Sequence, residues 1–140
     1  MIGYDAPHQL KRQLSIARDM LQAENHDTLK IGVGFLVWQL EKDPSLSEQL
    51  VSIAIDHHVQ AIWLAFGEDI GSWIKRIRSP ERHDAAESSV KVFVQVSTVE
   101  QALQAVNEWK ADVIVVQGSQ PNTHYFLISL VLLMGYFNRR

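Results

Sequence analysis

The stretch IGVGFLV, residues 31–37, decides the fold, because three runs of the same kind follow it along the chain. They are AIWLAF at 61–66, VKVFVQV at 90–96 and DVIVV at 112–116. All four are short and rich in β-branched and aromatic residues, and all but the third are almost continuously apolar. Such runs are typical of strands buried on both faces, as in parallel sheets. The sequence therefore predicts four strands of one parallel sheet.

Stretches of helical periodicity lie before the first run and between successive runs. Their apolar stripes are Leu10/Leu14/Ala17/Leu21, Leu46/Leu50/Ile53/Ala54, Ile70/Trp73/Ile74/Ile77 and Val99/Ala102/Leu103/Val106. Capping boxes at Ser45-x-x-Glu48 and Ser97-x-x-Glu100 mark the starts of the second and fourth helices. Strand-helix units of this length force parallel strands with right-handed crossovers. We therefore expect an α/β fold of about four parallel βα units with flanking helices.

Length and composition narrow the class of protein. The 140 residues make one domain and fall short of a complete (βα)8 barrel, which needs about 250 residues. A hydrophobic fraction of 46% with 21% charged residues is typical of a globular chain. The formal net charge of −3, without a basic stripe, argues against nucleic acid or an anionic membrane as a partner. The absence of cysteine, together with the absence of a signal-peptide stretch, favours the cytoplasm.

A further apolar run, FLISLVLLMGYF, occupies residues 126–137. Its twelve residues are too few to span a bilayer, which takes about 20. We expect a buried strand or helix there, or an exposed apolar tail.

Candidate site residues follow the strands, since parallel α/β sheets bind ligands at the carboxyl ends of their strands. Gln95 and Gln117 end two apolar runs, and such amides can donate and accept hydrogen bonds toward a heteroaromatic ring. The alternative is that Gln95 faces solvent and Gln117 caps a turn. His124 lies in the loop after the last run, where a general base would be carried. Phosphate-binding glycine motifs and a GxSxG elbow are absent from the sequence.

Five segments in order resemble the nitronate monooxygenase family, most closely its fungal members. They are GYDAP at 3–7, IGVGFL at 31–36, WLAFG at 63–67, QVSTVEQA at 95–102 and ADVIVVQGS at 111–119, followed by His124. The resemblance implies a TIM (βα)8 barrel that uses FMN and O2 to oxidise alkyl nitronates or nitroalkanes. It also implies flavin contacts from Gly34, Gln95, Gln117, Gly118, Ser119 and Asn122, with His124 as the base that deprotonates a neutral nitroalkane.

The chain also departs from the family pattern. Gln120 replaces an acidic residue, and Pro121-Asn122-Thr123 replaces Ala-Gly-Gly before His124. The likeness stops after His124, and the family's first strand and the last strands that bind the FMN phosphate are missing. We therefore expect a truncated, partial barrel domain at 1–124 followed by a divergent apolar tail at 125–140. A shifted reading frame near residue 120 would account for both the altered motif and the tail.

Two alternatives remain open. The chain can be a non-catalytic α/β module that has lost its flavin and acts by association, because exposed sheet edges favour self-association. It can also be an open sheet of flavodoxin-like type that binds another small ligand.

Overall fold

The computed structural model describes residues 6–79, 90–117 and 129–132. Along the chain the elements are α1 (Ala6–Met20), β1 (Leu29–Leu36), α2 (Val37–Leu40), α3 (Pro44–Asp56), β2 (Val59–Ala65), α4 (Ile70–Ile77), β3 (Lys91–Val96), α5 (Val99–Asn107), β4 (Val113–Gln117) and β5 (Ser129–Leu132). The four strands expected from the apolar runs are therefore confirmed. Among the described helices, none has both the length and the apolar character that crossing a membrane requires.

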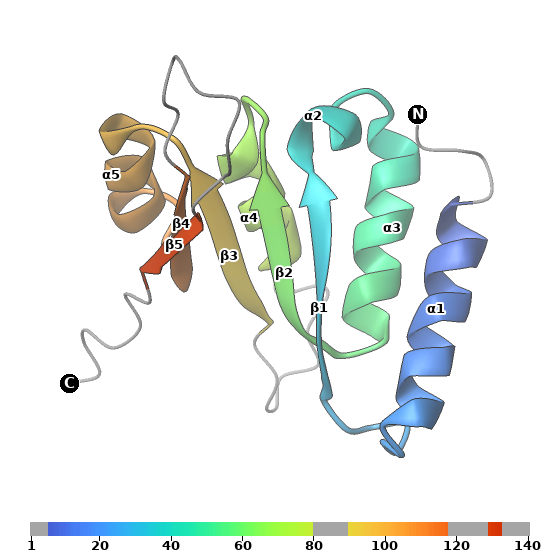
Figure 1. The fold of residues 1–140 in the computed structure, drawn as a ribbon. Helices are drawn as coiled ribbons and strands as arrows, with labels where there is room; N and C mark the ends of the chain where they lie inside the picture. The colour runs from blue at the N-terminus through green and yellow to red at the C-terminus, as the bar shows by residue number, and fades with distance from the viewer. Residues whose placement is uncertain (1–5, 80–89, 118–128, 133–140) are drawn as a thin grey trace, which may run out of the picture.

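The strands form one sheet in the order β1-β2-β3-β4-β5 (Figure 1). The first four strands pair in parallel, as expected, and their order follows the chain without a reversal. A flavodoxin-like sheet has the order 2-1-3-4-5, so the observed order argues against that alternative. β5 comes from the apolar segment 125–140 and pairs with β4 in the antiparallel direction.

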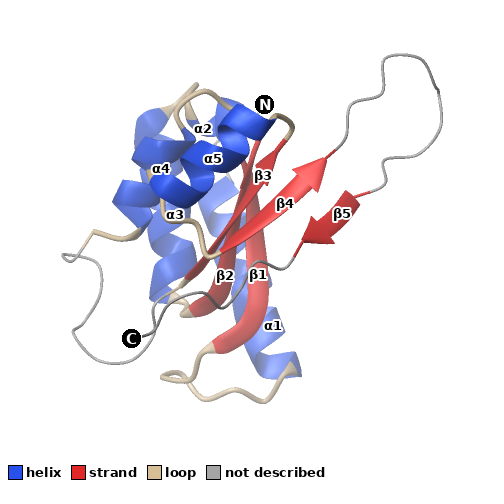
Figure 2. Cartoon of the chain, turned by 90° about the vertical axis from the view of Figure 1, so that its left-hand side faces the viewer, coloured by secondary structure: helices blue, strands red, loops and turns tan. Residues whose placement is uncertain are grey.

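Helices α2, α3, α4 and α5 lie on one side of the sheet, whereas α1 lies at the β1 edge beside α3 (Figures 1 and 2). The other face of β2, β3 and β4 carries no described helix (Figure 2). In Figure 1 the helix layer runs from α5, beside β4, to α1, which lies beyond α3 at the β1 end. Sequential parallel strands with helices on one face are what a series of βα units produces. The described strands do not close into a barrel.

The hydrophobic core lies between the sheet and the helices. In β3, Val92 and Val94 are fully buried, whereas the alternate Phe93 and Gln95 are half-buried on the uncovered face. Ile74 and Ile77 of α4 are also fully buried. Full burial of such a side chain contributes about 1.5–3 kcal/mol. The alternation in β3 therefore separates a core face from a face that is available for function.

Helix starts differ in detail from the predicted capping boxes. Asp43 caps α3, because its carboxylate accepts from the Leu46 amide at 3.0 Å, and Pro44 follows at the first helical position. Thr98 caps α5 by accepting from the Gln101 amide at 3.2 Å. Both predictions placed the cap on the wrong residue, since a neighbouring side chain with the same capping chemistry has the better position.

The apolar stripe predicted to bury α5 is mostly exposed. Val99, Leu103 and Val106 are 72%, 57% and 48% exposed, and Ala105 is the fully buried residue of this helix. The corresponding stripe of α4, by contrast, is buried along its whole length. Periodicity shows which residues share a helix face, but it does not show whether a partner covers that face.

Candidate functional site

The uncovered face of the sheet carries a hollow between β1, β2 and β3. It has a volume of about 330 Å³ and is lined by Gly32, Val33, Gly34, Ala61, Trp63 and Phe93. Strand pairing places Gly34 opposite Trp63 and Trp63 opposite Phe93. Paired residues of parallel strands share a face. Gly32 and Gly34 of β1 lack side chains, so they leave open space beside the Trp63 and Phe93 rings on the neighbouring strands. This open space is the hollow.

The two aromatic rings give the hollow a flat apolar wall. The Trp63 and Phe93 ring centroids are 6.0 Å apart and the ring planes differ by 17°, which is a stacked arrangement. A Cβ atom added to Gly34 would lie 4.0 Å from the Trp63 Cβ, so the position tolerates a side chain sterically. Such a side chain would fill part of the hollow. The site is thus shaped for a flat, mostly apolar group.

Gln95 and Gln117 meet on the same face. Gln95 pairs with Val115 in the sheet register, and Gln117 lies two residues further along β4. The Gln95 Nε2 atom donates a hydrogen bond to the Gln117 Oε1 atom. This bond leaves the Gln95 Oε1 atom as an acceptor and the Gln117 Nε2 atom as a donor. The two strand-end glutamines predicted from sequence are therefore brought together on this face.

The glutamine pair adjoins the hollow along the strands. Gln95 follows Phe93 by two residues on the same face of β3, a rise of roughly 6.6 Å. A ligand a little longer than this rise would cover the aromatic wall and reach the amides. Of the sequence-predicted residues, Gly34, Gln95 and Gln117 thus share one face, whereas Gly118, Ser119, Asn122 and His124 lie outside the described residues.

Trp63 and Phe93 were not predicted as site residues. Both sit in apolar runs, where an aromatic residue is usually a core residue. The signal that indicates them is the pairing of aromatic positions with glycine positions on the next strand. That signal needs the sheet register, which the sequence does not contain.

The backbone amides at the start of α4 are already bonded. The Glu41 Oε1 atom accepts from the Glu68 and Asp69 amides, each at 2.9 Å. Backbone amides at a helix start are a common seat for phosphate. Here a carboxylate of the chain itself takes that place, so these two amides are not open to a phosphate group.

The turn after β2 is held in an uncommon conformation. Phe66 has φ of 54°, a value that bulky residues rarely adopt, and its carbonyl accepts from the Trp38 amide at 2.8 Å. A Cβ atom on Gly67 would lie 2.4 Å from the Val37 Cγ1 atom. The turn is therefore fitted tightly against the start of α2, and Phe66 remains 49% exposed at the carboxyl end of the sheet.

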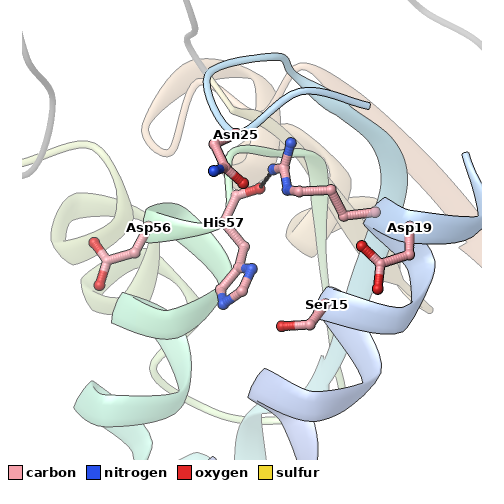
Figure 3. A pocket seen from close by; sticks show the side chains of 6 residues that line it. Ser15, Asp19, Asn25, Asp56 and His57 are labelled. Carbon is pink, nitrogen blue, oxygen red and sulfur yellow. Dashed lines mark hydrogen bonds between the residues drawn. The ribbon is translucent and has the colours of Figure 1, made fainter. Parts of the chain in front are cut away.

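A second hollow of about 420 Å³ lies between α1 and α3, at the opposite end of the strands. Figure 3 shows the residues that line it, which are Ser15, Arg18, Asp19, Asn25, Asp56 and His57. Arg18 is only 7% exposed and donates to three backbone carbonyls, those of Glu24, of Asp27 at 3.2 Å and of His57 at 2.6 Å. These bonds tie α1 to the end of α3, which gives Arg18 a structural role.

His57 ends α3 beside that guanidinium, and its imidazole points into the space between α1 and α3 (Figure 3). Burial lowers the pKa of His57 below its ordinary value of 6.5, and the positive charges of Arg18 and Lys11 lower it further. The neutral imidazole is therefore favoured in the folded chain. Since ligands of parallel sheets bind at the other end of the strands, we assign this hollow to stability and the uncovered face to function.

The chain was compared with known protein families, curated proteins and solved structures, and no match was found. A function for it therefore has to be inferred from its own residues and their geometry.

Proposed function

We propose that this chain is a fungal-type relative of the nitronate monooxygenases, with its four parallel βα units forming part of a TIM barrel. In this proposal the uncovered sheet face holds the ring of FMN, and the reaction is the oxidation of alkyl nitronates or nitroalkanes with O2. The supporting observation is the Gln95–Gln117 pair beside a flat hollow of glycines and aromatic rings.

The residues of this face suit a flavin ring. A flavin ring is flat and uncharged, and one edge carries alternating carbonyl and N–H groups. The stacked Trp63 and Phe93 rings offer a flat apolar surface, and the described residues that line the hollow include no charged side chain. The Gln95 acceptor and the Gln117 donor can pair with a carbonyl and an N–H group without adding charge. These residues would bind and orient the ring.

The described residues offer fewer binding groups to the FMN phosphate than to the flavin ring. Just before α4 the Glu41 carboxylate already accepts from the Glu68 and Asp69 amides, so these two amides are not open to the phosphate. Ring contacts alone supply only part of the binding free energy of a phosphorylated cofactor. We therefore expect weak binding of FMN by the 140-residue chain.

The chemistry divides between the cofactor and the chain. When bound, FMN would accept electrons from the nitronate and pass them to O2. His124 would remove the Cα proton of a neutral nitroalkane and so form the nitronate, a role that rests on the sequence resemblance alone. Because a preformed nitronate has already lost that proton, it would bypass His124.

Titration of the purified chain with FMN, followed by its visible spectrum, tests the cofactor. Flavin bands perturbed at saturation support the proposal, and Gln117→Leu should weaken binding about tenfold, the loss of one hydrogen bond. Gln104→Leu, an exposed change on α5, is the matched control and should leave binding unchanged. A folded wild-type chain whose flavin spectrum does not change at saturating FMN would contradict the proposal.

His124→Asn tests the base. The variant should lose turnover of neutral nitroalkanes and keep turnover of preformed nitronates, measured as O2 consumption. Equal rates of the variant and the wild type on both substrates would show that His124 is not the base.

A second candidate is the non-catalytic α/β module that acts by association. The Glu41 carboxylate favours it, since it takes two amides that a phosphate group could use, and among the described strands β1 pairs with β2 alone. A colourless chain that is folded by circular dichroism and takes up no flavin would favour this candidate.

A further inference from the structure

The helices that follow the first three strands begin with backbone amides that already bind side chains of the chain itself. At the start of α4 the Asp69 carboxylate accepts from the Ser72 amide at 3.3 Å. At the start of α5 the Thr98 hydroxyl accepts from the Gln101 amide at 3.2 Å, and Asp43 caps α3 in the same way. Helix starts at the carboxyl end of a parallel sheet are where such folds commonly bind phosphate. Here part of that hydrogen-bonding capacity is used within the chain.

Carboxylates are concentrated where β2 leads into α4. Glu41 follows α2, which lies at the carboxyl end of β1 (Figure 1), and its Oε1 atom accepts from the Glu68 and Asp69 amides at 2.9 Å each. Glu68 and Asp69 carry carboxylates of their own. The cation next to Glu41 is Lys42, whose Nζ atom lies 4.3 Å from the centre of the Trp38 ring. We call Glu41, Glu68 and Asp69 the acidic turn, and its charge opposes a phosphate, which brings roughly 1.5–2 further negative charges.

The hollow on the uncovered face has a different character. The described residues that line it are glycine, alanine, valine and the two stacked aromatic residues. Gln95 and Gln117 add hydrogen-bonding groups without charge. A flavin ring would therefore meet neutral groups, whereas a phosphate carried toward the carboxyl ends of β1 and β2 would meet the acidic turn.

We propose that this chain recognises flavins by the ring alone, so that riboflavin, which lacks the phosphate, binds at least as tightly as FMN, and that Glu41 sets this preference. The inference rests on the proposed flavin site and names the form of flavin that the site accepts. Glu41 acts in two ways, because it takes two amides that a phosphate could use and because its charge repels the phosphate. It is a specificity-determining residue that makes no contact with the ring.

Parallel titrations of the wild-type chain with lumiflavin, riboflavin and FMN, followed by the visible spectrum, test the preference. The dissociation constant of riboflavin should equal or fall below that of FMN, and lumiflavin, which is the ring without the ribityl chain, should bind much as riboflavin does. A lower dissociation constant for FMN than for riboflavin would overturn this inference and leave the flavin site standing. A folded chain that perturbs none of the three spectra would overturn both.

Salt separates repulsion of the phosphate from attraction. Screening weakens interactions between exposed charges, so added salt should tighten FMN binding toward that of riboflavin and leave riboflavin unaffected. If added salt weakens FMN binding, positive charge holds the phosphate and the inference is wrong.

Glu41→Gln tests the residue itself. The variant keeps an oxygen that can accept from the two amides but loses the charge, so FMN should bind about two- to fivefold more tightly while riboflavin binding stays the same. Glu24→Gln is the matched control, because it removes the same charge from an exposed position in the α1–β1 loop, at the opposite end of the strands, and should change neither affinity. Circular dichroism checks that both variants fold. An unchanged ratio of FMN to riboflavin affinity in Glu41→Gln would show that Glu41 does not set the preference.

Discussion

Arg78, at the end of α4, forms a 2.9 Å ion pair with Asp112, which lies 34 residues later and just before β4. The same Asp112 carboxylate accepts from the Val92 backbone amide at 2.8 Å, and the Asp112 amide donates to the Val92 carbonyl at 2.9 Å. One carboxylate therefore joins a helix end to two neighbouring strands at the amino-terminal end of the sheet.

Asp112→Ala should destabilise the chain by about 1–3 kcal/mol, because it leaves the amide of the fully buried Val92 without its acceptor. Asp112→Asn keeps an acceptor oxygen and should cost less. Urea unfolding followed by circular dichroism measures both. The control is Arg76→Ala, which removes the more exposed ion pair to Glu48 and should cost about 0.2–1 kcal/mol. Equal effects of the Asp112→Ala and Arg76→Ala changes would show that the amide contact contributes little.

Arg18→Met should also be destabilising, by about 2–4 kcal/mol, because three backbone carbonyls lose a shared cationic donor. Two of these carbonyls belong to the loop between α1 and β1, and the third ends α3. Arg12→Met, an exposed change on the same helix, should lie within about 0.5 kcal/mol of the wild type. The urea midpoints of the two variants measure the difference, and a small effect of Arg18→Met would refute the structural role.

The stability of the chain should fall as the pH is lowered through 6.5, owing to His57. Its pKa is lowered in the folded state by burial, by Arg18 and by Lys11, although Asp56 opposes the shift. Above pH 6.5 the imidazole is neutral in both the folded and the unfolded chain, so His57 causes no loss of folding stability there. Between 6.5 and the lower folded pKa the unfolded chain binds the proton first, and stability is lost.

The pH profiles of urea unfolding for the wild type and His57→Gln isolate this contribution. The variant should lose less stability than the wild type between pH 7 and pH 5, whereas His26→Gln, an exposed change in the α1–β1 loop, should follow the wild type. Parallel profiles for His57→Gln and the wild type would exclude His57 as the source.

Two glycine substitutions separate fold from function. Gly67→Ala should destabilise the chain by about 1–3 kcal/mol, because its Cβ would meet the buried Val37 at 2.4 Å. Gly34→Ala, whose Cβ meets an ordinary 4.0 Å contact, should unfold like the wild type yet weaken flavin binding by filling the hollow. Thermal unfolding and FMN titration of both variants make the comparison. If the Gly34→Ala chain binds FMN as tightly as the wild type, the flavin ring does not bind in this hollow.

The parts of the fold that depend on neighbouring residues in sequence were predictable. The run 31–37 and its three counterparts predicted parallel strands because burial on both faces leaves a nearly continuous apolar pattern. The meeting of Gln95 and Gln117 could be expected as well, because both lie at the carboxyl ends of strands that are consecutive in the chain. Both results follow from the strand pattern together with the parallel pairing of strands that are consecutive in the chain.

The parts that depend on long-range contacts were not predictable. Arg18 lies in a polar stretch of α1, and its burial follows from a bond to a carbonyl 39 residues away. The stripe of α5 has the spacing of a core face, but its helix stands at the end of the layer and the stripe lacks a cover among the described elements. The antiparallel direction of β5 depends on how the chain returns to β4, which apolar composition does not determine.

The pairing of β5 with β4 has a consequence for the growth of the sheet. The outer edge of β4 is occupied from Ile114 to Gln117 by an antiparallel strand. Another parallel βα unit can join there only by exchanging with β5, residue by residue, at the cost of the existing bonds. Because β5 already pairs with this edge of β4, a further parallel strand could extend the sheet there only by displacing β5. The two strands would therefore compete for one edge.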